Sequence, residues 1–371
     1  MTAPPPVDVA LAMLTLVPGA MGGSETYARA LTRELAESSD VTVTAYVAAV
    51  GAGFSQGVPE RVVPGVDGGP STGSRLTTIF QAFVHRHAIR TSWAEAAVVH
   101  FPFTAPIPRP AASTAVVVTL LDVQHLDLPD LFSRAERAYR RRFYDAAARH
   151  ADVVVTISEF AKSRIVARLA IEPERVVVAP LGVDTTEFEP NLGQRENLLL
   201  YPARGWPHKN HARLFQAFSL LRADDPTLRL VLTGGDLEGL GPVPPGVEVR
   251  GLVGRDELRQ LYRTAGTLVF PSLYEGFGLP PLEAMASGCP VAASRSGAIP
   301  EICGDAAVLF DAEDPGSIAA GVREALARSD DLRDRGLARV GSFTWTACAS
   351  AHEHAYRLAS GVRREAGSAR R

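Results

Sequence analysis

The 371-residue sequence predicts an α/β protein made of two doubly wound domains. Short apolar runs rich in β-branched residues alternate with helical patterns, and this alternation occurs in both halves of the chain. The runs are continuously apolar, which is typical of parallel strands that are covered on both faces. The chain length also favours two domains. Together these observations indicate two parallel sheets, each flanked by helices.

The first half of the chain contains apolar runs that we expect to be strands, at 7–17, 41–50, 96–101, 114–121, 151–157 and 175–180. Helical patterns between these runs predict helices over 24–37, 133–150 and 159–169. The segment 51–73, which is rich in Gly and Pro, is expected to be a flexible loop.

The second half repeats the pattern, with strands expected at 196–203, 227–235, 247–251, 266–272, 289–294 and 306–310. Helices are expected over 209–223, 255–265, 281–288 and 317–327. Pro, Asn and Gly interrupt the pattern over 182–196, so we expect one domain at 1–188 and a second at 189–345. A last helix within 346–371 is expected to pack back on the first domain and to end in a frayed basic tail, which includes Arg363, Arg364, Arg370 and Arg371.

Composition excludes several classes of protein. A net charge of −3 and no basic excess in either half argue against nucleic-acid binding. Three cysteines without C-x-x-C spacing argue against a disulfide scaffold or structural zinc site, and they fit a reducing, cytoplasmic setting. The first apolar run contains Asp8 and is too short to span a bilayer, so we interpret it as a buried strand.

A glycine-rich loop, Gly22-Gly23-Ser24-Glu25, follows the first expected strand and opens a helix, with Ser24 as the expected N-cap. Glycines there allow the backbone to approach a ligand, and free amides at a helix start favour an anion. The same residues could also form a simple capped turn.

Two cations follow the first strand of the second half. Arg204 and Lys209 lie across a turn just before a helix, where they could converge on a diphosphate. The alternative is that both side chains are merely solvated. Lysine is rare in this chain, since only Lys162 and Lys209 occur, and this favours a functional interpretation of Lys209.

The most specific stretch is 271–294, PSLYEGFGLPPLEAMASGCPVAAS. Glu275 is expected on a loop beside glycines that expose amides, and Glu283 near the start of the next helix, where the helix dipole favours a carboxylate. A carboxylate can accept two hydrogen bonds from a sugar diol. Alternatively, Glu283 only complements the dipole and Glu275 is only solvated.

Other patterns are absent or ambiguous. The sequence has no D-x-D. His352 and His354 are two residues apart on the last helix, and we expect both at the surface. Arginines cluster at 134, 137, 140, 141 and 142 and make the helix 133–150 basic, either as a solvated face or as a contact with an anionic membrane or acceptor.

In this order, the glycine loop, the Arg204…Lys209-Asn210 pair and the Glu275-x7-Glu283 block resemble the retaining glycosyltransferases of the GT-B fold, family 4. Three short motifs support the resemblance: Ile157-Ser158-Glu159-Phe160, Leu181-Gly182-Val183-Asp184 and Pro300-Glu301-Ile302. The resemblance runs from about residue 15 to about 325 and implies two Rossmann-like domains that face each other across a cleft.

The resemblance implies roles for individual residues. Arg204 and Lys209 would bind the diphosphate of a nucleotide-sugar donor, and Glu283 would hold its ribose. Glu275, Gly276, Phe277, Gly278 and Leu279 would surround the transferred sugar, and Val253 would line the base. Gly22, Gly23 and Ser24 would close over the phosphates. No cofactor and no metal are expected, because two cations and a helix N-terminus can stabilise the leaving group.

One departure concerns the end of the strand 114–121. Many relatives carry His-Asp where this chain has Leu121-Asp122. Any polar role at this strand end falls to Asp122, Gln124 or His125, and we expect His125 to face the donor sugar or the acceptor.

The sequence therefore predicts a hexosyltransferase acting on a glycan, a lipid-linked or a small-molecule hydroxyl, with GDP-mannose, a UDP-sugar or a TDP-sugar as donor. The alternatives are a sugar-nucleotide epimerase on the same fold and an inactive nucleotide-sugar-binding subunit. We expect a cytoplasmic protein, with peripheral membrane contact through the helix 133–150. The sequence does not indicate an oligomeric state.

Overall fold

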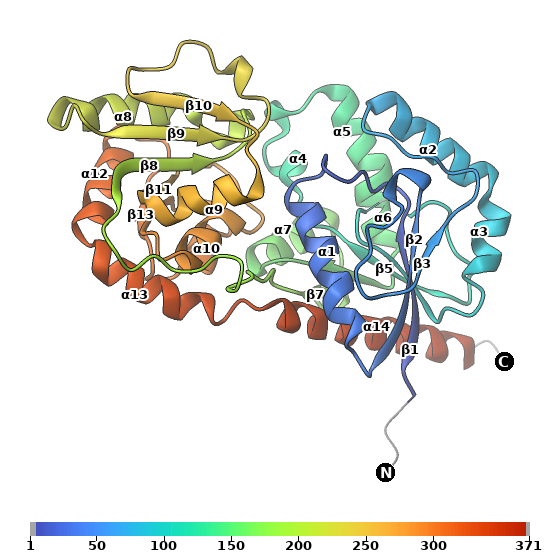
Figure 1. Ribbon diagram of the computed structural model, residues 1–371. Helices are drawn as coiled ribbons and strands as arrows, with labels where there is room; N and C mark the ends of the chain where they lie inside the picture. The colour runs from blue at the N-terminus through green and yellow to red at the C-terminus, as the bar shows by residue number, and fades with distance from the viewer. Residues whose placement is uncertain (1–4, 105, 369–371) are drawn as a thin grey trace. The chain divides into compact units, whose positions relative to one another are not determined.

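The computed structural model describes residues 5–104 and 106–368 (Figure 1). The chain forms two compact units, and each is described by itself. The first unit contains 1–157, 161–180 and 345–371, and the second contains 158–160 and 181–344. Each unit has one parallel sheet with helices, so the predicted fold class is confirmed.

The first unit has a seven-stranded sheet in the order β3-β2-β1-β4-β5-β6-β7. Its strands are β1 (Val7–Met13), β2 (Val41–Val47), β3 (Glu60–Val62), β4 (Val98–Phe101), β5 (Ala115–Thr119), β6 (Val153–Thr156) and β7 (Val176–Val178). Its helices are α1 (Gly23–Ala36), α2 (Thr72–Val84), α3 (Arg86–Ser92), α4 (Gln124–Asp127), α5 (Arg134–Arg140), α6 (Ala146–His150), α7 (Glu159–Leu169) and α14 (Trp345–Ser368). A single π-helical turn, Arg141–Asp145, joins α5 to α6.

The second unit has a six-stranded sheet in the order β10-β9-β8-β11-β12-β13. Its strands are β8 (Glu196–Pro202), β9 (Arg229–Thr233), β10 (Val247–Gly251), β11 (Ala265–Phe270), β12 (Val291–Ser294) and β13 (Val308–Phe310). Its helices are α8 (His211–Asp224), α9 (Arg255–Thr264), α10 (Leu279–Ala286), α11 (Ile299–Cys303), α12 (Pro315–Ala327) and α13 (Ser329–Val340). In both sheets the strand order reverses beside the first strand, which creates the kind of sheet edge where doubly wound folds bind ligands.

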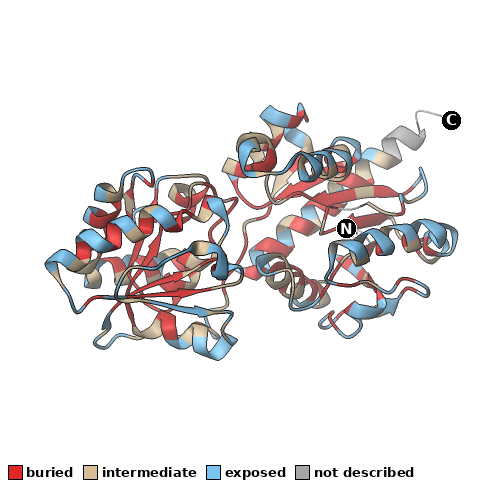
Figure 2. Ribbon diagram, turned by 90° about the horizontal axis from the view of Figure 1, so that it is seen from above, coloured by how far each residue is buried: buried red, intermediate tan, exposed pale blue. Residues whose placement is uncertain are grey.

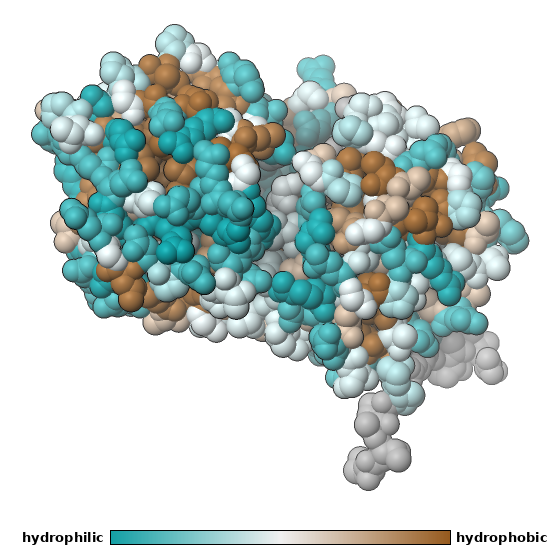
Figure 3. Space-filling model, in the orientation of Figure 1, coloured by the Kyte–Doolittle hydropathy of each residue, from teal (hydrophilic) through white to brown (hydrophobic). Residues whose placement is uncertain are grey.

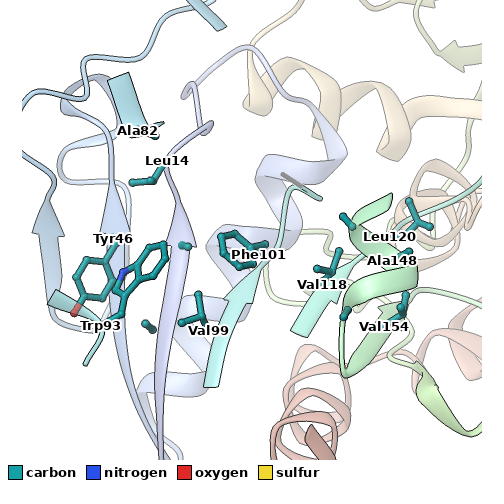
Figure 4. Packing of buried hydrophobic residues seen from close by; sticks show 14 of the residues in the cluster. Leu14, Tyr46, Ala82, Trp93, Val99, Phe101, Val118, Leu120, Ala148 and Val154 are labelled. Atoms are coloured by element: carbon teal, nitrogen blue, oxygen red, sulfur yellow. The ribbon is translucent and has the colours of Figure 1, made fainter. Parts of the chain in front are cut away.

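Apolar side chains of the first unit form its core between sheet and helices. Trp93 packs edge-on against both Tyr46 and Phe101, with ring centroids 6.0 and 5.9 Å away (Figure 4). Val99 and Val118, from adjacent central strands, belong to the same cluster. Figure 2 shows the strands of both units buried, whereas the helices are exposed on their outer sides.

The segment 51–73 is not the flexible loop that its composition predicts. It contains β3, which pairs in parallel with β2 at the edge of the sheet. The Glu60 carboxylate accepts hydrogen bonds from the amides of Gly53 (2.6 Å) and Ser55 (2.9 Å). Burial alone would raise the pKa of Glu60, but the bonds to this carboxylate outweigh it and lower the pKa. A short edge strand of this kind gives a weak sequence signal, because three residues show no periodicity.

The division between the units lies at Pro180–Leu181 rather than at 188–189. Val183 donates its amide to the Phe343 carbonyl, which ties this segment to the second unit. The helix α14 belongs to the first unit, where Arg363 forms an ion pair with Asp152 (2.9 Å). Arg363 is therefore not frayed; Arg370 and Arg371, also in the predicted tail, lie outside the described residues.

The prediction that His352 lies at the surface is wrong, because a buried polar network joins α14 to the sheet. His352 Nε2 lies 2.7 Å from the Tyr27 hydroxyl, which also bonds Thr119 at 2.9 Å. His100 bonds the same Thr119 (2.8 Å) and the Tyr356 hydroxyl (2.9 Å). All five side chains are buried, so α14 is fixed by directional bonds as well as by apolar contacts.

Candidate active site

The first cation-bearing loop, between β8 and α8, is built by close backbone packing. Gly205 has no Cβ, and one placed there would lie 1.9 Å from the carbonyl oxygen of Asp236 on the loop after β9. The Gly205 amide donates to the Gly235 carbonyl at 3.0 Å. Glycine is therefore required at 205, and the contact brings the carboxyl ends of β8 and β9 together.

Arg204 lies at this junction and is held by Asp236. Its Nη1 is 3.2 Å from Asp236 Oδ2, and the indole Nε1–H of Trp206 donates to the same oxygen at 3.2 Å. The Arg204 guanidinium also lies over the Trp206 ring, 5.3 Å from its centroid. Asp236 gives no motif in the sequence, and we did not predict its contact with Arg204.

Lys209 and Glu275 form a close ion pair. Lys209 Nζ donates to Glu275 Oε1 at 2.6 Å, and their side chains are only 15% and 14% exposed. Lys209 ends a short 3₁₀ turn, Pro207–Lys209, and Asn210 follows in a left-handed conformation with φ of 62°. The Asn210 side chain donates to the Pro271 (3.0 Å) and Ala312 (2.7 Å) carbonyls, which fixes the turn against the loops after β11 and β13.

Glu275 is followed by three buried residues whose backbone amides have no acceptor in the described structure. The three amides belong to Gly276, Phe277 and Gly278. These amides precede α10. The N-cap of that helix is Gly278, and its φ of 122° is a conformation that requires glycine at this position. Free amides at a helix N-terminus attract anions and polar oxygens. The Phe277 ring is buried against Phe343, so its side chain serves packing.

Glu283 lies one turn into α10 and contacts a different partner. The Tyr262 hydroxyl donates to Glu283 Oε2 at 2.8 Å. Burial raises the pKa of Glu283, while the bond from Tyr262 and the charge of Arg255 oppose that shift. Burial and the adjacent carboxylate also raise the pKa of Tyr262 well above its usual value. The tyrosine therefore stays a donor and fixes the orientation of Glu283.

The remaining donor-site residues of the second unit lie close to these elements. Val253 follows β10 and is half-buried, and Leu279 is the first residue of α10. Leu252, the neighbour of Val253, is 80% exposed and comes close to Gly235 on the loop that carries Asp236. The structure thus brings Lys209 and Glu275 into contact, whereas Arg204 and Glu283 have separate partners.

The glycine loop of the first unit differs from its prediction in one respect. Gly22, not Ser24, is the N-cap of α1, and Ser24 lies inside the helix. Gly22 has φ of 57° and ψ of −130°, a conformation open only to glycine, and its carbonyl accepts the amide of Glu25 at 2.9 Å. Gly22 and Gly23 are both exposed. The Gly-Gly step therefore sets the helix start, and the Ser24 hydroxyl is not needed for it.

His125 does not face a ligand, contrary to the prediction. Its side chain is fully buried, and Nε2 donates to Asp145 Oδ1 at 2.9 Å. Asp122 is half-buried, and its Oδ1 accepts the amide of Gln124 at 3.1 Å, which forms an Asx turn. His125 belongs to the short helix α4, which begins at Gln124. The sequence shows no strong pattern that would assign Asp145 as its partner.

Two of the short motifs contribute side chains that form hydrogen bonds with backbone groups. Ser158 Oγ donates to the Gly276 carbonyl at 2.7 Å. The Glu301 carboxylate accepts the amides of Glu159 (2.8 Å) and Phe160 (2.9 Å). These contacts hold the loop that presents the amides, so both motifs act indirectly.

Comparison with family models supports the same interpretation. A model described as Glycosyltransferase Family 4 matches residues 21–187, and one described as Glycosyl transferases group 1 matches residues 183–336. Together the two matches extend from the glycine loop to α13.

Curated relatives are similar over parts of the chain. O-antigen chain mannosyltransferase B of Escherichia coli is 28% identical over 76% of this chain and 81% of its own length. MMP alpha-(1->4)-mannosyltransferase of Mycolicibacterium hassiacum is 35% identical over 55% of this chain, and D-inositol 3-phosphate glycosyltransferase of Geodermatophilus obscurus is 32% identical over 53%. This chain spans only about half the length of the last two, 53% and 50%.

Solved structures share the fold. Sucrose-phosphate synthase from Thermosynechococcus elongatus has a TM-score of 0.76 at 21% identity, covering 95% of this chain and 98% of that one. HepE from Anabaena, in complex with UDP-glucose, has a TM-score of 0.68 at 15% identity, covering 96% and 99%.

Proposed function

We propose that this chain, which belongs to the group 1 (family 4) glycosyltransferases of the GT-B fold, transfers a hexose from a nucleotide-diphosphate sugar with retention of anomeric configuration and without a metal. The acceptor is a hydroxyl of a glycan, a lipid-linked or a small molecule. Because two of the relatives named above are mannosyltransferases, mannose is the first sugar to test.

The observation that carries the proposal is the Lys209–Glu275 pair beside the free amides of residues 276–278. A cation, a carboxylate and three backbone donors within one loop suit a ligand with both anionic phosphate and neutral hydroxyls. The carboxylate accepts from sugar hydroxyls, and the ammonium and amides donate to oxygens that gain charge as the phosphate leaves. Arg204, held by Asp236, supplies the second cation to the diphosphate.

Glu283 is assigned to the ribose of the nucleotide. One of its oxygens is occupied by Tyr262, so the carboxylate is fixed in orientation before a ligand arrives. Such preorganisation reduces the entropy that binding would otherwise cost. Val253 is assigned to the base of the nucleotide, and Leu279 to a contact with the donor. Additional contacts with the phosphates are assigned to Gly22, Gly23 and Ser24. Asp122 keeps its predicted polar role, in addition to the turn that it stabilises.

The test uses the purified chain with GDP-mannose, UDP-glucose and a TDP-sugar, each with and without sugar acceptors. We expect release of free nucleotide with acceptor and formation of an anomer of the same configuration by NMR. Activity should persist in EDTA, because fixed cations stabilise the leaving group. Loss of activity in EDTA that Mg²⁺ or Mn²⁺ restores would exclude the metal-free mechanism.

The same assay separates the alternatives. An epimerase would convert the sugar nucleotide to its epimer without release of nucleotide when no acceptor is present. A binding subunit would bind nucleotide without turnover, and binding would appear as a thermal shift. Nucleotide at 100-fold its Kd stabilises a protein by about 2.7 kcal/mol, so the best base can be identified by that shift before any acceptor is known.

A further inference from the structure

The helix α2 of the first unit exposes an apolar face that the proposed transfer reaction does not use. Leu76, Phe80, Phe83 and Val84 are 55%, 66%, 57% and 52% exposed. They are spaced as i, i+4, i+7 and i+8, so they lie on one side of the helix. Figure 3 shows hydrophobic side chains at the surface in the region of α2. Exposed apolar residues that cluster in this way mark an interaction site, whereas single ones do not.

This face borders a groove of about 610 Å³. Its lining comes from α2 and the adjoining α3, the loop 106–109, and the π-helical turn with α6. Besides the α2 residues, Ile107, Pro108 and Phe143 line the groove. A volume of this size is typical of a binding site for a small ligand or a part of a larger one.

Four guanidinium groups line the same groove. They belong to Arg86, Arg90, Arg109 and Arg142. All four residues are exposed, and among the ion pairs that the described residues form, none involves these four arginines. The stretches 68–94 and 96–121 contain no Asp or Glu at all. In a chain with a net charge of −3, this is a local positive surface around an apolar groove.

The orientation of two of the arginines is fixed by the protein. Arg90 Nε donates to the Arg109 carbonyl at 2.6 Å, which ties α3 to the loop 106–109. Arg86 donates to the Phe83 carbonyl at 3.0 Å and lies over the Phe83 ring at 4.6 Å. These two exposed arginines are therefore held beside the apolar face, so apolar and anionic contacts would be made together.

We propose that α2, with Arg86, Arg90, Arg109 and Arg142, is a docking surface for a bilayer that contains anionic phospholipids. Phe80 and Phe83 insert at the level of the headgroups, and the arginines bind lipid phosphates. The combination of protruding aromatic side chains with unpaired cations is the chemistry of an interfacial membrane contact. Among the described residues no helix is long and apolar enough to cross a membrane, so this contact would be peripheral.

The proposed membrane surface differs from the predicted one, which was the basic helix 133–150. In that helix Arg140 is paired with Glu136 (3.0 Å) and lies over the Phe132 ring, and Arg134 does not line the groove. Of the arginines in this helix, only Arg142 lines the groove. The inference is independent of glycosyl transfer, since none of these residues belongs to the proposed donor site.

The test is co-sedimentation of the full chain with vesicles of phosphatidylcholine alone or of phosphatidylcholine mixed equally with phosphatidylglycerol. We expect binding to the mixed vesicles and little binding to phosphatidylcholine, and we expect salt to weaken it. The Phe80→Ser/Phe83→Ser variant should lose at least about tenfold in affinity. Arg86→Gln/Arg142→Gln should lose about 25-fold, since each basic residue near an anionic surface contributes about fivefold.

Two matched controls should keep parental binding. Leu220→Ser removes an exposed apolar side chain of α8 in the second unit, and Arg134→Gln removes a charge of α5 outside the groove. Circular dichroism and thermal unfolding check that every variant is folded, which is expected because the changed side chains are exposed.

Three results would overturn the proposal: equal binding to both vesicle types, parental binding by both groove variants, or a loss of binding with Arg134→Gln that matches the groove variants. The same measurements would also identify either of two other occupants of the groove. Binding of a soluble alkyl phosphate but not of vesicles would indicate a site for a single small ligand. Self-association that Phe80→Ser/Phe83→Ser abolishes, without vesicle binding, would indicate a contact between two copies of the chain.

Discussion

Lys209 Nζ lies 2.6 Å from Glu275 Oε1, and both side chains are about 15% exposed, so the two charges neutralise each other in the donor-free protein. The two residues are 66 positions apart and come from the loops after β8 and β11. A donor that binds here must contact both groups at once. The pair therefore acts as one element, and its members have coupled roles.

Substitution of Lys209 should therefore affect catalysis more than folding. Lys209→Ala removes one preorganised charge at the leaving group, which typically lowers kcat by about 10²–10³. Lys162→Ala, a change of the only other lysine in the chain, is the matched control and should leave kcat unchanged. Steady-state kinetics with a saturating donor measures the effect. If Lys209→Ala turns over within a few-fold of the parent rate, the assignment of Lys209 to the diphosphate is wrong.

Arg204 and Asp236 can be separated by two variants. Arg204→Ala should lower kcat by about 10²–10³ for the same electrostatic reason. Asp236→Asn keeps an acceptor for Trp206 and removes the charge, and since an exposed ion pair contributes little, activity should change by less than about fivefold. If Asp236→Asn instead lowers kcat as much as Arg204→Ala, Asp236 has a direct role with the donor.

Glu283 and Glu275 should differ in which part of the donor they bind. Glu283→Ala should lower the affinity for free nucleotide by about 10- to 100-fold. Glu275→Ala should leave that affinity unchanged and lower the affinity for the intact sugar donor. Tyr262→Phe removes the bond that orients Glu283 and should give a smaller loss of nucleotide affinity. Isothermal titration with the free nucleotide and with the intact donor distinguishes these effects. An equal loss of nucleotide affinity in both glutamate variants would contradict the assignment.

His125 should contribute to stability rather than to turnover. His125→Ala leaves the buried Asp145 carboxylate without this donor, which costs about 1–3 kcal/mol of unfolding free energy. His125→Asn restores a donor on a short side chain and should recover part of the loss. Urea denaturation provides the comparison, with kcat measured on the folded fraction. A variant with parental stability but a much lower kcat would show that His125 acts in catalysis.

The buried histidines should make stability depend on pH. Burial lowers the pKa of His352 from 6.5 to about 4, and burial together with His352 lowers the pKa of His100. Between these values the unfolded chain binds a proton that the folded chain excludes, so the free energy of unfolding falls as pH drops from 6.5 toward 4. The slope is about 1.4 kcal/mol per pH unit for one such histidine.

Urea denaturation at pH 7 and pH 5 tests this expectation. His352→Gln should be less stable at pH 7, because it breaks the bond to Tyr27, but its stability should fall less between pH 7 and pH 5. His354→Gln, on the exposed side of the same helix, should retain the parental pH dependence. An unchanged slope in His352→Gln would show that His352 does not titrate in this way.

The sequence predicted both sheets and the loops that carry the site, because continuous apolar runs and glycine-rich strand ends are local signals. It did not predict contacts that depend on packing between distant segments. Nothing near His352 or His125 marks either residue as buried, because each finds its hydrogen-bond partner on another element. Gly205 was visible in the sequence, but its requirement follows only from the approach of Asp236. Likewise, the sequence does not show that the apolar side chains of α2 stay exposed, because that depends on how the helix packs.

The return of α14 to the first unit has a consequence for synthesis of the protein. The sheet of that unit is complete once β7 has been made, but α14, which supplies His352 and Tyr356 to its interior, is made only after the whole second unit. The second unit is nearly continuous in sequence and can fold while the first still lacks this helix. The first unit to be translated is therefore the last to be completed, and a chain that stops before Trp345 would expose an unfinished core to chaperones and proteases.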